Sequence, residues 1–597
     1  MQGVPARASR PLVRRRDARV ASAAAALCAG VKMHVLRRAR RVPRDRLPTP
    51  DRMDDSNDFL IPLIPPLLAM LGQAADAHAR GEHDAHALWL AAAGHLHAVD
   101  MAALAQLTSA LVARQRAADA LALAECAVRV HPGAGARFNH GYVLQMLGRH
   151  AEAVAPYRAA YALDPRWPSL RNNLAIALRL SGGDRNEEIA LLDAAVEANP
   201  HDVQAWINLV VARLAAQDLD GALACAARLA QIAPDNALAL NNIAMAMKEA
   251  QRWDDAERYA ARACELAPDD ASFRFNLAII QLVRGNYAAG WRGHEARWDG
   301  AGELRGRRPA LPGPRWQGEP LAGKTLLVWG EQGLGDVLQF ARFVAPLAER
   351  VHREGGRLAW NTFPQVGTLM QRSLGAHADA FSAGGSVDEL PAFDYEVPLI
   401  GLPLMLGMET STLGESVPYL HADRHARDAW RARLAGDGRL NVGLVWTGSP
   451  GHQRNPFRRV GLDRYADAFR GIDGVTFHSL QPGADADVAA ARAAGFAIED
   501  YTAELKSFDD TAAFIGALDL VITVCTSVAH LAGALGARTW VLLDVNPHWP
   551  WLLERTDSPW YPTATLYRQP TFGAWAPVMA ALGRDLRGLA AQAKRPA

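Results

Sequence analysis

Prolines that recur at an almost constant spacing constrain the fold of this chain more than any other feature of its sequence. Pro132, Pro165, Pro200, Pro234 and Pro268 are separated by 33, 35, 34 and 34 residues. The segments between them are similar to one another, as in "FNHGYVLQMLGRHAEAVAPYRAAYALDP" and "LALNNIAMAMKEAQRWDDAERYAARACELAP". Self-similarity at this period predicts stacked helix pairs, in which each unit buries its apolar face against the next.

The residues between these prolines resemble the tetratricopeptide repeat, in which small residues let two antiparallel helices approach closely and a proline closes each unit. A weaker unit precedes this region and a closing unit follows it, so that about six or seven units cover residues 60–298. We expect an all-α solenoid over residues 57–298, with a concave surface for a protein partner. The matching positions are Gly141, Gly148, Ala153, Tyr157, Ala160 and Pro165 in one unit, and Trp206, Leu209 and Ala222 in another.

Charge is distributed unevenly along the chain. Residues 1–52 contain 13 Arg and one Lys against three Asp, a formal charge of +11, so the remainder carries −10 within the net charge of +1. This basic stretch predicts disorder over residues 1–56, or translated sequence ahead of a true start near Met53. The acidic remainder argues against a nucleic-acid partner. No apolar run reaches the ~20 residues of a membrane span, and five scattered cysteines favour a cytoplasmic location.

The sequence pattern changes at Asp299. Residues 299–323 are rich in Gly and Pro and predict a linker. Beyond them, short apolar runs alternate with helical stretches, which is typical of parallel βαβ units whose sheet is covered on both faces. The runs are "TLLVW", "RLAWNT", "NVGLVW", "VTFHSL", "DLVITV" and "TWVLL". We expect two Rossmann-like halves, at residues 324–430 and 431–597.

A glycine-rich turn, "GEQGLGDVLQF" at residues 330–340, follows the first of these strands. A dinucleotide-binding fingerprint would need a third glycine where Leu338 stands. A Walker loop would need Lys and then Ser or Thr where Asp336 and Val337 stand. Both phosphate-binding interpretations therefore fail. The turn instead places the Asp336 carboxylate at the mouth of the sheet, either as a general base or simply as a helix cap.

A second constellation lies in "DLVITVCTSVAHLAGALG", residues 519–536. A buried strand ends at Cys525, and a helix follows that begins near Thr526 and Ser527 and contains His530. A helix N-terminus at the ligand face of a sheet predicts a site for an anion. His530 is either a second donor to a diphosphate or a histidine packed against the neighbouring strand.

From about Pro314 to its end, the chain resembles the heptosyltransferase-like glycosyltransferases of family 9, which have the two-domain GT-B fold. More closely, it resembles bacterial proteins that join tetratricopeptide repeats to such a domain. The segments that match are "PRWQGEPLAGKTLLVWGEQGLGDVLQFARF", "VGLVWTGSP", "SLQPG", "DDTAAFIGALDLVITVCTSVAHLAGALG" and "DSPWYPTATLYRQP".

The resemblance implies that Asp336, after Gly335, is the catalytic base, and that the second half binds a nucleotide sugar. It places the donor diphosphate at Thr526, Ser527 and His530. A basic residue after a glycine turn often faces the donor phosphates in this family, and Arg458 is the nearest match, with Arg454 and Arg459 as alternatives. Nucleotide-sugar contacts are also expected at Gly333, Gln339, Gly448, Gln481 and Cys525.

One position departs from the family pattern. Cys525 stands where the family usually has Asp, and a thiol is a poor hydrogen-bonding substitute for a carboxylate that touches sugar hydroxyls. The "DAD" at residues 485–487 is expected to be a solvated turn rather than a metal site. No cofactor or metal is expected, because a helix N-terminus and an arginine suffice to stabilise a leaving diphosphate.

Three functions follow as expectations. The first is metal-independent, inverting transfer of a sugar from a nucleotide-diphosphate donor, the co-substrate, to a hydroxyl of a protein that the repeats recruit. The second is heptosyltransferase-like transfer in the assembly of lipopolysaccharide or another saccharide, with the repeats serving complex assembly. The third is a non-catalytic repeat scaffold with a degenerate transferase domain.

Overall fold

The computed structural model describes residues 64–94, 108–130, 132–331, 333–384, 389–408, 413, 417–436, 438–452, 454–571 and 573–593. The basic segment at residues 1–56 lies outside the described residues. The chain divides into two compact units, Met1–Asp218 and Leu219–Ala597. No helix in the described ranges combines the length and the apolar character that crossing a membrane requires.

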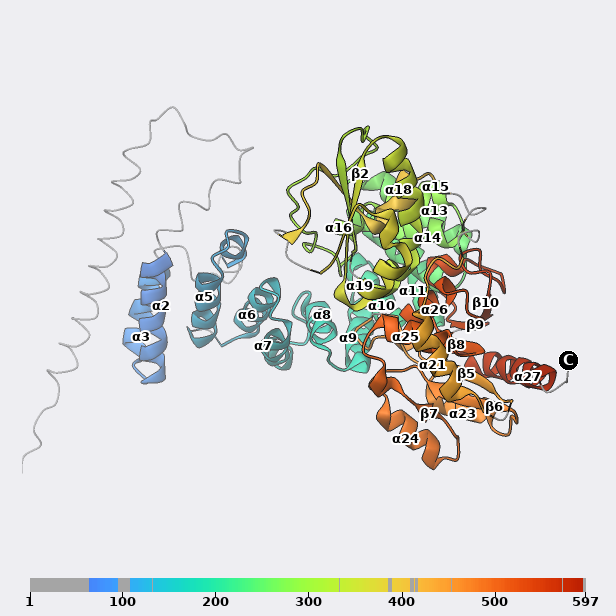
Figure 1. The fold of residues 1–597 in the computed structure, drawn as a ribbon. Coiled ribbons are helices and arrows are strands. Elements are labelled where there is room, and N and C mark those ends of the chain that lie inside the picture. The colour runs from blue at the N-terminus through green and yellow to red at the C-terminus, as the bar shows by residue number, and fades with distance from the viewer. Residues whose placement is uncertain are drawn as a thin grey trace, which may run out of the picture. The chain divides into compact units, whose positions relative to one another are not determined.

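The first unit is a series of antiparallel helix hairpins, which confirms the predicted repeats (Figure 1). Gly141 shows why small residues recur: a Cβ atom at this position would lie 2.7 Å from the ring of Tyr157, which packs on it with no exposed surface. Asp184 and Asp202 cap the helices that follow them by accepting backbone N–H groups. The helices are α2 (Ile64–Ala79), α3 (His83–Gly94), α5 (Ala117–Val130), α6 (Ala134–Met146), α7 (His150–Leu163), α8 (Leu170–Ser181), α9 (Arg185–Ala198) and α10 (Val203–Ala215).

The second unit begins with the last helices of the solenoid. The predicted repeat region, residues 57–298, thus continues into this unit, and its helices from Leu219 onward belong to one compact body with the sheets. Asn236, Asp270 and Asn286 cap three of them. The helices are α11 (Leu219–Ile232), α12 (Ala237–Glu249), α13 (Trp253–Leu266), α14 (Ala271–Val283), α15 (Tyr287–His294) and α16 (Arg297–Gly300).

The first sheet has four parallel strands in the order β3-β2-β1-β4. The predicted strands "TLLVW" and "RLAWNT" are β1 (Thr325–Trp329) and β2 (Arg357–Thr362), while β3 (Ala380–Ala383) and β4 (Tyr395–Pro398) escaped prediction because they are short. The order reverses between β1 and β4, and open α/β sheets bind ligands at such points. Its helices are α17 (Leu334–Phe340), α18 (Val344–Arg353), α19 (Pro364–Leu374) and α20 (Leu402–Met405).

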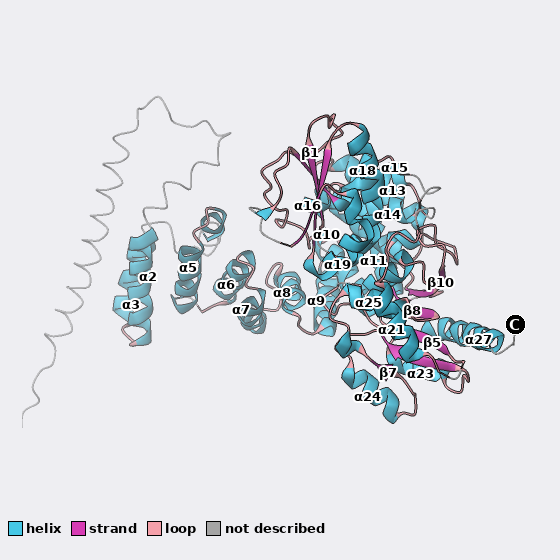
Figure 2. Cartoon of the chain, in the orientation of Figure 1, coloured by secondary structure: helices cyan, strands magenta, loops and turns pink. Residues whose placement is uncertain are grey.

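The second sheet has six parallel strands in the order β10-β9-β8-β5-β6-β7 (Figure 2). This is the strand order of doubly wound nucleotide-binding sheets, and the order reverses between β5 and β8. Ile522 of β8 packs in one core cluster with residues of α23 and α27, and Val521 packs in another with residues of α25 and α26. Both faces are therefore covered. The strands are β5 (Leu440–Val445), β6 (Val475–Ser479), β7 (Glu499–Asp500), β8 (Leu520–Val524), β9 (Thr539–Leu543) and β10 (Ala564–Arg568). The helices are α21 (Arg424–Leu434), α22 (Asn455–Arg458), α23 (Leu462–Phe469), α24 (Asp485–Ala493), α25 (Phe508–Ile515), α26 (Ser527–Ala534) and α27 (Trp575–Ala593).

The segment predicted as a linker, residues 299–323, is packed against the first sheet. Trp316 is fully buried, its backbone N–H donates to the carbonyl of Glu396 in β4 at 2.8 Å, and its indole donates to the carbonyl of Glu319 at 2.9 Å. The linker prediction is thus wrong for this part of the segment. The Gly- and Pro-rich chain around Trp316 runs along the edge strand β4 and is bonded to it, so it is not a flexible linker there.

An ion-pair network fixes the solenoid to the second sheet. Arg454 donates to Glu249 of α12 at 2.6 Å and to Asp544, after β9, at 2.9 Å, while Asn546 donates to Glu249 at 2.6 Å. Glu249 and Asp544 are almost completely buried. Arg454, one of the alternatives for a phosphate ligand, is therefore a structural clamp.

We expect Arg454→Met to destabilise the protein by about 3–5 kcal/mol, because two buried carboxylates would lose the guanidinium group that pairs with both of them. Chemical denaturation measures the change. Arg459→Met is the matched control, because Arg459 is exposed in the same segment. Equal stability of the two variants would contradict this role for Arg454.

Candidate functional site

A cavity of about 450 Å³ opens at the carboxyl ends of β5, β6 and β8, next to the point where the order of the second sheet reverses. Four of the predicted donor-binding residues line it: Gly448 after β5, Gln481 after β6, and Thr526 and Ser527 after β8. Gln365 of α19 contributes from the first sheet. Segments far apart in the sequence thus converge where an open α/β fold binds its ligand.

The electrostatic character of this cavity favours an anion. The helix α26 begins at Ser527 without any side-chain cap, so the positive end of the helix faces the cavity. Lys506 and Ser507 also line it, at the start of α25. We did not anticipate Lys506, although the capping box that Ser507 forms with Asp510 marks this second helix start in the sequence.

The glycine turn after β1 folds the Asp336 side chain back over its own backbone. Gly333 has a φ of 99°, and a Cβ atom at this position would collide with the Asp336 carboxylate. Gly333 is also the N-cap residue of α17 and makes no side-chain cap. Asp336 is the third residue of this helix rather than its N-cap.

The Asp336 carboxylate is partly buried, and its environment favours the neutral form. Burial raises its pKa to about 7, and the nearby carboxylates Glu331 and Glu303 act in the same direction, against Arg297. A carboxyl group with this pKa is half ionised near neutral pH. It can therefore accept a proton and release it again at the pH of a cell.

The Asp336 turn and the start of α26 are in direct contact. A Cβ atom on Gly335 would lie 3.5 Å from the Cα of Ser527 and 3.4 Å from the His530 ring. These are ordinary van der Waals distances, so the turn lies directly against the start of the helix. The turn that carries the carboxylate and the anion-favouring helix end, predicted from separate motifs, are thus brought together.

His530 is buried and neutral. Its Nδ1 lies 3.0 Å from the Tyr561 hydroxyl, its ring stacks on Trp551 with centroids 5.4 Å apart, and burial lowers its pKa well below the usual value. The ring is therefore packed among aromatic side chains. A tautomer whose Nδ1 accepts from Tyr561 leaves Nε2–H as a neutral donor, and the contact with a diphosphate stays a prediction.

Cys525 and Arg458 lie behind the cavity wall. The Cys525 thiol accepts from the Trp551 indole at 3.1 Å, and burial raises its pKa. Arg458 packs on Gly448 and donates to the carbonyl of Cys525 at 2.8 Å. It therefore holds the end of β8, while Lys506 is the cation that lines the cavity.

Gln339, an expected nucleotide-sugar contact, is not among the residues that line the cavity. Its side chain is fully buried, and neither amide atom has a hydrogen-bond partner. Of the "DAD" residues, Asp487 accepts the indole N–H of Trp446 at 2.7 Å in the first turn of α24. The expected solvated turn is therefore part of a helix. Within the described residues no group of His, Cys, Asp and Glu is arranged to hold a metal ion.

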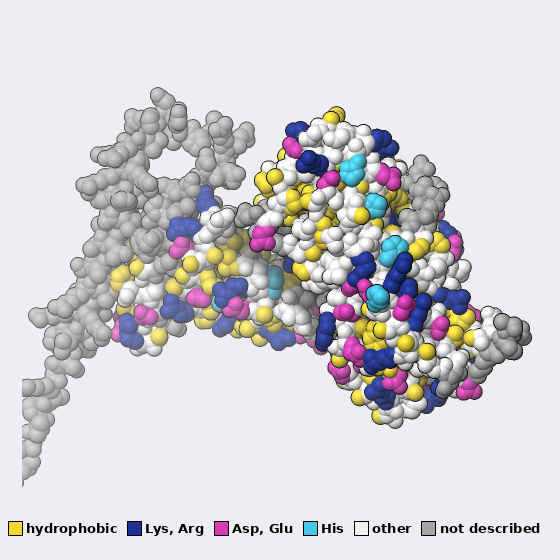
Figure 3. Space-filling model, viewed as in Figure 1, with side chains coloured by type: hydrophobic (Ala, Val, Ile, Leu, Met, Phe, Trp, Pro, Cys, Tyr) yellow, Lys and Arg dark blue, Asp and Glu magenta, His cyan; other side chains and the backbone are white. Residues whose placement is uncertain are grey.

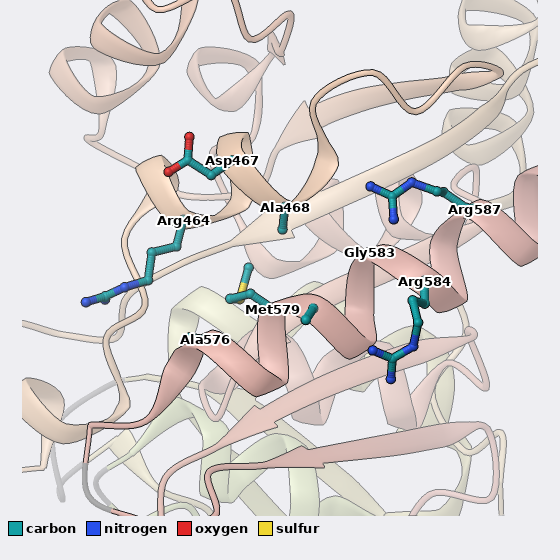
Figure 4. Close-up of a pocket in the computed structure, with 9 residues that line it drawn as sticks. Arg464, Asp467, Ala468, Ala576, Met579, Gly583, Arg584 and Arg587 are labelled. Carbon is teal, nitrogen blue, oxygen red and sulfur yellow. The ribbon is translucent and has the colours of Figure 1, made fainter.

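A second cavity, of about 570 Å³, lies between α23 and α27, away from every predicted site residue (Figure 4). Arg464, Arg584 and Arg587 surround a floor of Met579 and small residues. On the face of the molecule in Figure 3, by contrast, acidic and basic side chains are interspersed over the coloured surface.

Comparisons with known proteins agree with the repeats. A family model for the tetratricopeptide repeat matches residues 104–168, 178–237 and 242–298. Solved structures that match part of the chain include PilW, a type IV pilus biogenesis factor (21% identity, 34% of this chain and 96% of that chain, TM-score 0.31). Another is a thermophilic tetratricopeptide-repeat protein of Thermus thermophilus (22% identity, 31% and 100%, TM-score 0.27). The family model shows that the chain contains tetratricopeptide repeats.

One curated relative matches a much longer part of the chain. Protein FlbA of Caulobacter vibrioides is 30% identical over 476 residues, which is 76% of this chain and 72% of that protein. The family model for the repeats ends at residue 298, so an alignment of 476 residues must also include part of the region that forms the two sheets.

Proposed function

We propose that this chain, which belongs to the family of Protein FlbA of Caulobacter vibrioides, is a glycosyltransferase. It transfers a sugar from a nucleoside-diphosphate donor to a hydroxyl of a protein that its repeats bind. The observation that carries the proposal is the contact between the Asp336 turn and the uncapped start of α26, at the edge of an anion-favouring cavity. A proton acceptor and a diphosphate site are the two parts that metal-independent glycosyl transfer needs.

The two halves divide the chemistry between them. The donor diphosphate binds at the start of α26, where the helix end and Lys506 stabilise the negative charge that develops on the leaving group. Asp336 accepts the proton of the attacking hydroxyl as the new glycosidic bond forms and the bond to the diphosphate breaks. Attack from the face opposite the leaving group inverts the anomeric carbon.

The GT-B fold is the architecture that best accounts for this arrangement. Two parallel sheets, each with a reversal of strand order, direct the carboxyl ends of β1 and β8 toward one another through α17 and α26. The resemblance of the segments around Gly335 and Ser527 to family 9 glycosyltransferases supports the same reading. A heptosyltransferase-like role in saccharide assembly would use the same site with a different acceptor.

Release of nucleoside diphosphate tests this function. The protein is incubated with uridine, guanosine, adenosine and cytidine diphosphate sugars, with and without a cell extract as the source of acceptor. We expect slow release from one donor that the extract accelerates, and a matching mass increase on a protein. A mass increase on a saccharide alone would support the saccharide-assembly role. No release from any donor would leave the scaffold role.

A further inference from the structure

We propose that Arg297, a residue of the repeat solenoid, is a positioning residue for the turn that carries Asp336, and that it acts through Glu331. The inference rests on the proposed function, because it assigns a role within the same site. It also makes the solenoid part of the catalytic machinery rather than a recruiting arm alone.

Arg297 forms a two-pronged ion pair with Glu331. It belongs to α16, the last helix of the solenoid, and only 1% of its side chain is exposed. Its Nε donates to one carboxylate oxygen of Glu331 and its Nη2 to the other, both at 2.8 Å. Nη1 donates to Glu295 at 2.8 Å. Such paired geometry fixes both side chains in orientation as well as distance.

Glu331 connects this pair to the catalytic turn. It is the second residue after β1, five positions before Asp336, and is as deeply buried as its partner. The oxygen that accepts from Nη2 of Arg297 also accepts the backbone N–H of Ile400 at 3.1 Å, at the end of β4. The carboxylate thus joins the solenoid to both strands that flank the strand-order reversal of the first sheet.

The same pair sets the charge environment of Asp336. The charged groups that face Asp336 are Glu331 and Glu303, which raise its pKa, and Arg297, which lowers it. On the side of α26 the neighbours are His530, whose pKa is lowered well below neutrality, and the Cys525 thiol, whose pKa is raised. Arg297 is therefore the cation that opposes full protonation of Asp336.

Loss of Arg297 is expected to act in two ways. Glu331 would become an unpaired buried carboxylate, which shifts the turn or takes up a proton. Asp336 would lose Arg297, the one cation among the described residues that lowers its pKa, and this pKa would rise further. A merely structural ion pair would produce the loss of stability but would leave the titration of Asp336 in place.

The experiment compares Arg297→Met, Arg297→Lys, Glu331→Gln and the double variant Arg297→Met/Glu331→Gln in the full chain. Arg292→Met serves as the matched control, because Arg292 is exposed on the adjacent helix and bonds only the carbonyl of Ala288. The readouts are the melting temperature, the dissociation constant of a nucleoside diphosphate, and the pH profile of donor turnover.

We expect Arg297→Met to lower both the melting temperature and turnover, the latter by roughly tenfold or more, and to move the rising limb of the pH profile to higher pH. Binding of the nucleoside diphosphate should change little, because its site lies in the other half. Arg297→Lys should recover only part of the rate, since an ammonium cannot form the two-pronged pair. The double variant should recover melting temperature and most of the pH profile, because it removes the carboxylate that raises the pKa of Asp336 together with the cation that lowers it. It should not recover the rate, because the pair that fixes the turn is still missing.

A titration independent of turnover separates this inference from the proposed function. Because the folded pKa of Asp336 is raised, the carboxyl favours folding at low pH, and this contribution is lost as pH rises through about 7. The difference in melting temperature between Asp336→Asn and the unaltered protein should therefore level off near pH 7. In an Arg297→Met background it should continue to grow at higher pH.

Two results would overturn the inference. One is that the difference in melting temperature caused by Asp336→Asn levels off at the same pH with and without Arg297. The other is a double variant that recovers its rate along with its melting temperature, which would show that the pair only supports the fold. Absence of turnover in the unaltered protein would instead refute the proposed function, while the melting experiment would still decide the role of Arg297.

Discussion

Replacement of Asp336 by Asn will reduce sugar transfer by roughly 10²–10⁴-fold, the usual contribution of a general base. Asn has nearly the same size and keeps the hydrogen-bonding capacity of the turn, but it cannot accept the proton of the acceptor hydroxyl. Gly333 rather than Asp336 is the N-cap residue of the helix, and Asn stabilises a helix start about as well as Asp. Folding and nucleoside-diphosphate binding should therefore survive.

The pH dependence of turnover tests the same role of Asp336. A base acts in its deprotonated form, so turnover of the unaltered protein should rise with pH and level off above about 7, the pKa of Asp336. The residual activity of Asp336→Asn should lack this limb. Initial rates from pH 5 to 9 measure both. Normal turnover in Asp336→Asn would end the catalytic assignment and leave the turn as a structural feature.

Removal of the last repeats will prevent the sheets from folding. The fragment 299–597 lacks Tyr287 and Trp291, which belong to one hydrophobic core with the first sheet and the segment after β9. Trp291 packs against Trp549 at 5.1 Å between ring centroids, and Tyr287 accepts the indole N–H of Trp560 at 2.9 Å. Several buried aromatic side chains would become exposed, each typically worth 3–5 kcal/mol when truncated, which exceeds the stability of most domains.

The fragment 219–597 retains these contacts and is the matched control. It should be soluble and unfold in one cooperative transition, whereas 299–597 should aggregate or lack a transition. Circular dichroism during heating distinguishes the two. The complementary fragment 57–298 would expose the same aromatic residues from its side. Equal melting curves for 299–597 and 219–597 would refute the interdependence of solenoid and sheets.

The sequence allowed prediction of the elements whose signals are local. The proline spacing predicted the helix hairpins, and apolar runs predicted six strands, three of which match their observed bounds residue for residue. The glycine turn and the motif around Ser527 located both sides of the candidate site. Each of these signals depends on residues within one repeat or one βαβ unit, so no long-range contact had to be known.

Long-range contacts account for what the sequence did not reveal. Arg297 and Glu331 are separated by 34 residues, and Glu249 and Arg454 by 205, so nothing in either local sequence marks them as partners. The buried Trp316 looked like part of a linker because Gly and Pro surround it. Nothing in the local sequence indicated that Gln339, an expected nucleotide-sugar contact, is fully buried.

The most direct measurement of the central claim is calorimetric titration of nucleoside diphosphates into the full-length protein and two charge-reversal variants. Lys506→Glu alters the cavity at α26, and Arg584→Glu alters the cavity between α23 and α27. We predict that one nucleoside diphosphate binds and that Lys506→Glu weakens binding roughly tenfold or more, about 1.4 kcal/mol, while Arg584→Glu leaves it unchanged. Absence of binding, or weakening by Arg584→Glu alone, would contradict a donor site at the start of α26.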